Sequence, residues 1–114
     1  MEKLESLIQT AHQLRAPGGC AWDAEQTHHS LIQYLLEETF ELIEAIEAGS
    51  REEVMEELGD VLLQVYFHSR IAQDHPTDPF TIDDVAGAIA DKLISRHPHV
   101  FAGVEVGGTE EIIE

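Results

Sequence analysis

Positive charge is scarce in this sequence. Only six of its 114 residues are Lys or Arg, against 23 Asp and Glu, so the formal net charge is −17 when the His residues are neutral. A chain this acidic repels the phosphates of nucleic acids and of anionic membrane surfaces. We therefore expect neither a nucleic-acid polymer nor a membrane among its partners.

Cysteine and long apolar runs are scarce as well. The one cysteine, Cys20, excludes an internal disulfide and a zinc site built on cysteines. It has no His or basic neighbour to activate it, so we interpret it as a structural thiol. No apolar run reaches the roughly 18–20 residues that cross a bilayer, and no signal-peptide pattern follows Met1. These absences favour a cytoplasmic protein.

The remaining composition is that of a globular chain. Hydrophobic residues make up 43% and charged residues 25%, which is enough apolar material to oppose wholesale disorder. A length of 114 residues suits one compact domain with a core of its own.

Helical patterning covers most of the chain. Pro17-Gly18-Gly19 ends a first helix and Gly49 a second, while Ser50 and Thr81 each begin a helix with an acid three residues later. The predicted helices cover residues 3–15, 30–48, 50–73 and 81–96, with a long loop at 16–30 and a further helix beginning at Thr109. Because no strand pattern of useful length competes, the predicted fold class is all-α, an antiparallel four-helix-type bundle.

Two acidic pairs stand out on the second and third predicted helices. They are Glu38 with Glu41 and Glu57 with Asp60, and Glu37 precedes the first pair. At about 100° per residue, each pair lies on one rotational side of its helix, at the margin of an apolar stripe. The short connection at Gly49 makes the helices antiparallel neighbours, so the pairs can converge on one spot. We expect the two stripes to be buried: Leu31, Leu35, Leu42, Ile43 and Ile46 on the second helix, and Val54, Leu58, Val61, Leu62 and Val65 on the third.

Converging carboxylates repel one another unless a positive charge joins them. Ligands that are all oxygen favour a hard divalent cation, Mg²⁺ first and Mn²⁺ as the alternative. A di-iron bundle would need Glu-x-x-His pairs, and neither pair contains His. The competing hypothesis is a non-enzymatic acidic helical module that dimerises or binds a partner and uses its acids for solubility. We assign five other acids to a solvated face of this kind: Glu44, Glu47, Glu52, Glu53 and Glu56.

Three segments together resemble the MazG type of all-α nucleoside triphosphate pyrophosphohydrolase. The first is the acidic pattern itself, from Glu37 to Asp60. The second is Gly19-Cys20-Ala21-Trp22-Asp23-x-Glu25-Gln26-Thr27, similar to the loop that precedes the second helix in MazG proteins. The third is Lys92-Leu93-Ile94-Ser95-Arg96-His97-Pro98-His99-Val100-Phe101, similar to the end of their fourth helix. The resemblance covers most of the chain, about residues 19–101.

The resemblance implies an activity and a set of roles. The activity is Mg²⁺-dependent hydrolysis of a nucleoside triphosphate between its α and β phosphates, giving a monophosphate and pyrophosphate. The implied metal ligands are Glu38, Glu41, Glu57 and Asp60, which with Glu37 as a supporting acid form the catalytic set. Lys92 and Arg96, which share a helix face at i and i+4, are implied to hold phosphate.

Four further residues are candidates for substrate contact, each with an ordinary alternative. Gln26 could read a base edge or bond to backbone, and Trp22 could stack on a base or pack in the core or a subunit contact. His97 could donate to phosphate or cap its helix, and Tyr34 flanks the first acidic pair. The sequence does not separate these alternatives, nor does it exclude a narrower enzyme acting on a deoxynucleotide or a modified nucleotide.

A second apolar line, through Tyr34, Phe67 and Ile71, needs covering. We therefore expect a homo-oligomer, a dimer or a tetramer. We also expect residues 1–114 to form a single MazG-like helical domain, either truncated at its C-terminus or one domain of a longer protein.

Overall fold

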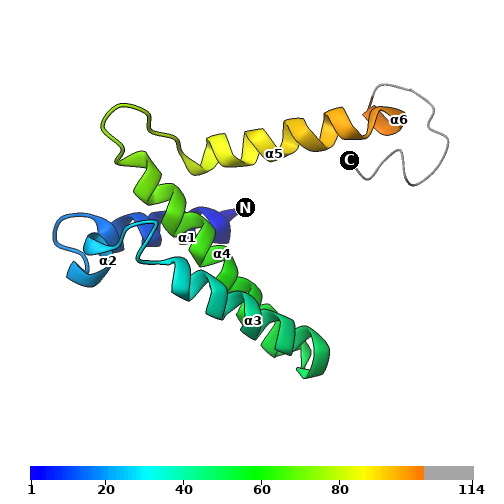
Figure 1. Ribbon diagram of the computed structural model, residues 1–114, viewed down its shortest axis with the longest axis horizontal. Helices are drawn as coiled ribbons and strands as arrows, with labels where there is room; N and C mark the ends of the chain where they lie inside the picture. The colour runs from blue at the N-terminus through cyan, green and yellow to red at the C-terminus, as the bar shows by residue number, and fades with distance from the viewer. Residues whose placement is uncertain (102–114) are drawn as a thin grey trace. The chain divides into compact units, whose positions relative to one another are not determined.

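The computed structural model describes residues 1–101 (Figure 1). Its regular structure in that range is entirely helical, which confirms the all-α class. The helices are α1 (Glu2–Arg15), α2 (Ala21–Glu25), α3 (Ile32–Ala48), α4 (Arg51–Gln73), α5 (Ile82–Arg96) and α6 (Pro98–Phe101). The helix expected to begin at Thr109 lies outside the described residues. The chain divides into two compact units, Met1–Phe80 and the part that begins at Thr81.

Local signals set the helix ends much as the sequence predicts. The Ser50 hydroxyl accepts a hydrogen bond from the Glu53 backbone N–H at 3.2 Å, which caps α4. At the start of α5, Thr81 and Asp84 make both bonds of a capping box, at 2.9 and 3.3 Å. The predicted loop at 16–30 contains the short helix α2, and Pro98, expected to follow a helix, is also the first residue of α6.

The first unit is organised around α4. In Figure 1, α3 runs beside the first half of α4, and α1 crosses α4 closer to its C-terminal end; both pairs are in contact. The turn between α3 and α4 depends on Gly49, because a Cβ there would lie 2.7 Å from the Ala45 carbonyl oxygen. That close approach lets α3 and α4 form an antiparallel hairpin.

The prediction that both apolar stripes are buried is confirmed for half of their residues. Leu31 is buried, and four further stripe residues are half-buried: Leu42, Val54, Val61 and Leu62. The packed faces also carry the acidic pairs, together with Ala45 and Phe67. Both helices are apolar on more than one face, so periodicity alone does not decide which face meets its partner. The exposed stripe residues are Leu35, Ile43, Ile46, Leu58 and Val65.

The second unit, described by itself, holds α5 and α6, which contact each other. Its helix α5 has an apolar side on which Ile89, Leu93 and Ile94 are about half exposed. Within residues 1–101, no helix has both the length and the apolar content that a bilayer crossing requires.

Candidate metal centre

The hairpin brings the two acidic pairs together. One carboxylate oxygen from each of Glu38, Glu41, Glu57 and Asp60 lies within 4.8 Å of the others. Residues three apart share a helix face, and the antiparallel turn at Gly49 sets the pair on α3 against the pair on α4. The four residues expected as metal ligands are therefore gathered at one place, which we call the acidic cluster.

The environment of the cluster disfavours negative charge. Burial raises the pKa of the Glu38 carboxyl, and the charges of Asp60 and Glu41 raise it further. Burial likewise raises the pKa of Glu57, with the charges of Glu41, Asp60 and Glu38 adding to the effect. The Oε2 atoms of Glu38 and Glu57 are buried and have no hydrogen-bond partner among residues 1–101.

These carboxylates fit a hard divalent cation. The donor set is all oxygen, and two of its oxygen atoms are shielded from water without a partner. The three ion pairs found in the described part of the chain lie elsewhere, on Asp74 and Glu52. No His belongs to the cluster, so the donor set lacks the Glu-x-x-His pairs of a di-iron centre.

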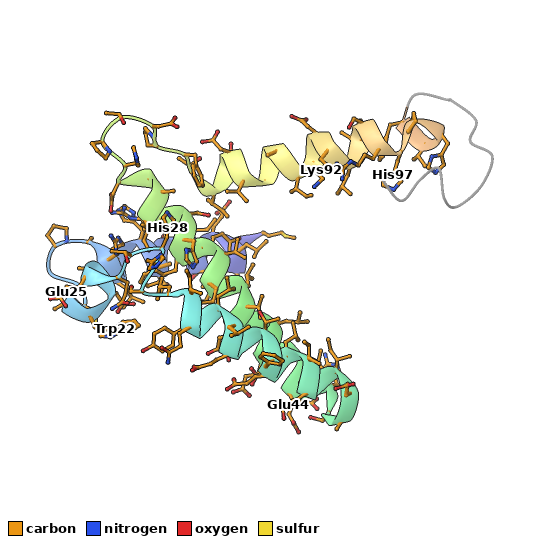
Figure 2. All side chains as sticks on the ribbon, in the orientation of Figure 1. Trp22, Glu25, His28, Glu44, Lys92 and His97 are labelled. Carbon is orange, nitrogen blue, oxygen red and sulfur yellow. The ribbon has the colours of Figure 1, made fainter. Side chains whose placement is uncertain are left out.

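The cluster is accessible from the turn of the hairpin. An open hollow of about 260 Å³ lies there, lined by Glu41 and Glu57 of the cluster and by Glu44 and Glu53 beside it. Figure 2 shows Glu44 close to the turn between α3 and α4. Glu37, in contrast, lies outside the cluster: it is exposed, and its carboxylate accepts a hydrogen bond from Gln33 at 3.2 Å. A supporting role for Glu37 stays a prediction.

The segment between α1 and α3 holds two of the substrate candidates. Gln26 is 9% exposed; its Nε2 donates to the Trp22 carbonyl at 2.9 Å and its Oε1 accepts from Ser30 Oγ at 2.7 Å. Gln26 therefore stabilises this segment through hydrogen bonds. Its contact with a nucleotide base stays a prediction. The Trp22 and Tyr34 rings meet edge to face, 5.8 Å between centres, and are 48% and 37% exposed. Tyr34 lies one turn before Glu38, so this aromatic pair stands beside the cluster on α3.

Arg15 ties that segment to α4, a role that the sequence analysis missed. Its guanidinium donates to the carbonyls of Asp23 and Gln26 at 2.9 and 2.7 Å and to the Asp74 carboxylate at 3.3 Å. Arg70 donates to the same carboxylate at 2.6 Å, and this bond above all lowers the pKa of Asp74. Arg15 and Asp74 are 59 residues apart in sequence, so no local pattern could reveal their contact.

Two more missed residues lie on α4. His68 Nδ1 lies 2.8 Å from His28 Nδ1, and with ring planes only 3° apart the rings meet edge to edge through a hydrogen bond. Figure 2 labels His28 on the segment before α3. Gln64, one turn after Asp60, is buried and has an unpartnered amide oxygen within the described residues. Because Gln64 follows Asp60 by four residues, the sequence alone could have placed it on the same helix face as the acidic pair.

The other substrate candidates lie in the second unit. Lys92 is exposed and Arg96 half-buried on α5, at the expected spacing of i and i+4. His97 follows α5 as its C-terminal cap, and its Nδ1 lies 2.7 Å from the Leu93 carbonyl oxygen (Figure 2). The capping alternative thus has structural support, whereas phosphate contacts by these three residues stay predictions.

Comparisons with known proteins identify the family of the chain. The family model of the MazG nucleotide pyrophosphohydrolase domain matches residues 26–101. A nucleoside triphosphate pyrophosphohydrolase of Mycolicibacterium smegmatis is 50% identical over 113 residues, 99% of this chain and 34% of that protein. A nucleoside triphosphate pyrophosphohydrolase/pyrophosphatase MazG of Thermotoga maritima is 54% identical over 97 residues, 85% of this chain and 37% of the relative.

A nucleoside triphosphate pyrophosphohydrolase of Escherichia coli K12 is 40% identical over 114 residues, covering 99% of this chain and 43% of the relative. The chain thus spans less than half the length of these three relatives. Because the family model matches more than half of the chain, this chain belongs to the MazG nucleotide pyrophosphohydrolase domain family.

Proposed function

We propose that this chain is a Mg²⁺-dependent nucleoside triphosphate pyrophosphohydrolase, with Mn²⁺ as an alternative ion. It cleaves the substrate between the α and β phosphates and releases a nucleoside monophosphate and pyrophosphate. The observation that carries the proposal is the gathering of four carboxylate oxygens within 4.8 Å on the packed face of a MazG hairpin. Relatives named for this activity support it.

The acidic cluster would hold the cation through Glu38, Glu41, Glu57 and Asp60. A cation bound there supplies positive charge to the phosphates and lowers the pKa of water. This charge matters because a triphosphate carries roughly four negative charges near neutral pH and the chain itself carries −17.

The hydrolytic step forms a bond from a water oxygen to the α-phosphorus and breaks the bond from that phosphorus to the oxygen bridging it to the β phosphate. A cluster carboxylate takes the proton from the water, and pyrophosphate leaves with the bridging oxygen. Glu37, outside the cluster, would orient water or a ligand at its margin.

Substrate contacts form the second part of the proposal. Lys92 and Arg96 hold phosphate, with His97 as a further donor. The aromatic pair of Trp22 and Tyr34 offers its exposed faces to the base, and Gln26 holds Trp22 in place while remaining a candidate for contact with the base.

Assembly is the third part. The open face of the hairpin carries exposed apolar side chains, and a groove of about 380 Å³ on α4 is lined by Met55, Leu58 and Leu62. So large an apolar face favours association. A second copy of the hairpin, packed face to face, would complete the expected four-helix bundle in a dimer, and two dimers would make a tetramer.

We retain residues 1–114 as one MazG-like helical domain, and a cytoplasmic location stays a prediction from the single cysteine.

The experiment is product identification in ¹⁸O-labelled water. We expect the chain with Mg²⁺ to convert a nucleoside triphosphate into monophosphate and pyrophosphate, with the label in the monophosphate. Label in pyrophosphate would place the attack on the β-phosphorus, and formation of diphosphate plus orthophosphate would exclude cleavage between α and β. A panel of ribo-, deoxyribo- and modified nucleotides in the same assay identifies the substrate.

Glu41→Ala should remove turnover with unchanged helicity by circular dichroism, while the control Glu47→Ala, an exposed acid on α3, should retain turnover.

The competing function is a non-enzymatic helical module that binds a partner, which the exposed apolar side chains of α3 and α4 would also suit. It predicts no turnover and no thermal stabilisation by Mg²⁺. Melting curves with Mg²⁺ and with EDTA therefore separate the two functions independently of substrate choice.

A further inference from the structure

Gln64 is a buried polar residue of α4 that the acidic motif does not include. The residue is 9% exposed, and its Oε1 is shielded from solvent with no hydrogen-bond partner in the described part of the chain. An acceptor left in this way destabilises a fold unless a donor reaches it. The other buried side-chain oxygens without a partner in residues 1–101 are Glu38 Oε2 and Glu57 Oε2, both within the acidic cluster.

Helix geometry directs Gln64 toward that cluster. It follows Asp60 by four residues and Glu57 by seven, so all three lie on one face of α4. Side chains of a helix lean toward its N-terminus, and the cluster lies on the N-terminal side of Gln64. Since α3 runs antiparallel, Gln64 stands at the end of the cluster away from Gly49, whereas the open hollow lies at the Gly49 end.

The chemistry of an amide suits this position. A fifth carboxylate here would add to the repulsion that already raises the pKa of Glu38 and Glu57. An amide oxygen accepts a hydrogen bond without adding charge, and it is too weak a base to take a proton. Its suitable partner is therefore a neutral donor held among carboxylates.

We propose that Gln64 is a positioning residue of the site, whose Oε1 accepts a hydrogen bond from the water molecule that attacks the substrate. The proposal rests on the proposed function. Gln64 orients the water oxygen toward the α-phosphorus, while the proton goes to a carboxylate of the cluster. The hydrogen bond from this water also satisfies the buried Oε1 of Gln64.

Two substitutions of opposite character test this proposal. Gln64→Met keeps the length of the side chain and removes the acceptor, whereas Gln64→Glu keeps an acceptor and adds a charge. Gln73→Met is the matched control, because Gln73 is an exposed glutamine of the same helix. For each protein, the measurements are Tm in EDTA, Tm with Mg²⁺, kcat and KM at one protein concentration.

Gln64→Met should raise Tm in EDTA by about 4 °C or more, because it removes a buried acceptor without a partner. It should also reduce the Mg²⁺-induced rise in Tm and lower kcat about tenfold or more, with KM within about twofold, since the hydrogen bond acts on the reacting water. Gln64→Glu should show the reverse: a lower Tm in EDTA, with kcat in Mg²⁺ within about threefold of wild type. Gln73→Met should change none of these quantities.

A packing role for Gln64 predicts a different result. Gln64→Met would then lower Tm in EDTA or leave it unchanged, with kcat unaffected, and this outcome would overturn the proposal. If the wild-type chain hydrolyses no nucleotide, the proposed function fails. The melting curves still test whether Gln64 belongs to the site that binds Mg²⁺. An equal Mg²⁺-induced rise in wild type and Gln64→Met would then exclude it from the site.

Discussion

At the scale of single residues, identical side chains behave differently according to the face that carries them. Glu44 and Glu47 on α3 are exposed, whereas Glu38 on the same helix meets the acids of α4. The same contrast on α4 separates Glu56 from Glu57. The pKa of Glu38 and that of Glu57 are raised because burial and neighbouring carboxylates both disfavour the charged form.

Replacing Glu57 should stabilise the metal-free protein near neutral pH. Since folding raises the pKa of Glu57 above 4.5, its ionisation destabilises the folded state as pH rises beyond that value. Glu57→Gln should therefore have a higher Tm than wild type in EDTA at neutral pH, and the advantage should shrink as pH falls toward 4.5. The same variant should lose most of its Mg²⁺-induced rise in Tm. Glu56→Gln, an exposed neighbour, serves as the control, and equal behaviour of the two variants would contradict the assignment of Glu57 as a ligand.

The bond between His28 and His68 predicts a stability that falls as pH falls, opposite to the effect of Glu57 ionisation. Burial, and then the nearby His28, lower the pKa of His68 below 6.5, so the unfolded chain takes up a proton more readily. The stability from neutral His68 is complete above that value and is lost as pH falls below it. Urea unfolding should show that His28→Ala costs about 1 kcal/mol at about pH 8 and less at about pH 5. His29→Ala, at an exposed neighbour, should cost little at either pH; equal costs for the two variants would argue against a His28–His68 bond.

At the scale of elements, the segment between α1 and α3 depends on one side chain from outside it. Arg15 donates to two carbonyls in this segment, at Asp23 and Gln26, and joins them to Asp74 at the end of α4. This network places α2, and with it Trp22, against Tyr34.

Loss of Arg15 should loosen this segment. The Arg15 side chain is 13% exposed, so Arg15→Met leaves half-buried acceptors without a donor and should cost about 2 kcal/mol in the free energy of unfolding. Arg51→Met is the control: Arg51 pairs with Glu52 on the surface at 80% exposure, and its loss should cost less than about 0.5 kcal/mol. Urea unfolding measures both, and Trp22 fluorescence should change in the first variant alone. Similar stabilities for the two variants would show that Arg15 does not organise the segment.

At the scale of the whole molecule, many large apolar side chains of the described residues are exposed. Ile46, on α3 before the hairpin turn, is 63% exposed, and Met55, on α4 after the turn, is 57% exposed. Large exposed apolar side chains on both helices of the hairpin favour an interface between subunits.

Charge on this face should dissociate the oligomer. We expect wild type to elute as a dimer or a tetramer, and Ile46→Lys combined with Met55→Lys to elute as a monomer with unchanged helicity, because a buried unpaired charge opposes association. Glu47→Lys, which adds a lysine at an exposed acid, should leave the oligomer intact. Light scattering during gel filtration measures the mass, and a monomeric wild type at micromolar concentration would contradict the predicted assembly.

Local features were predictable from the sequence because they depend on neighbours along the chain. The caps at Ser50 and Thr81 and the turn at Gly49 require only a few adjacent residues. The acidic cluster was predictable for a related reason: spacing of three residues fixes a helix face, and a short turn fixes which helices are neighbours.

What the sequence alone determined is therefore the all-α class, the helix ends and the set of acids that meet. Only the tertiary structure decided which face of the hairpin packs inward, because an amphipathic pattern specifies a face and not its partner. It alone revealed the contact of Arg15 with Asp74 and the bond of His28 to His68, which join residues 59 and 40 positions apart. Contacts at that separation follow from the packing of helices against one another, and no local spacing encodes them.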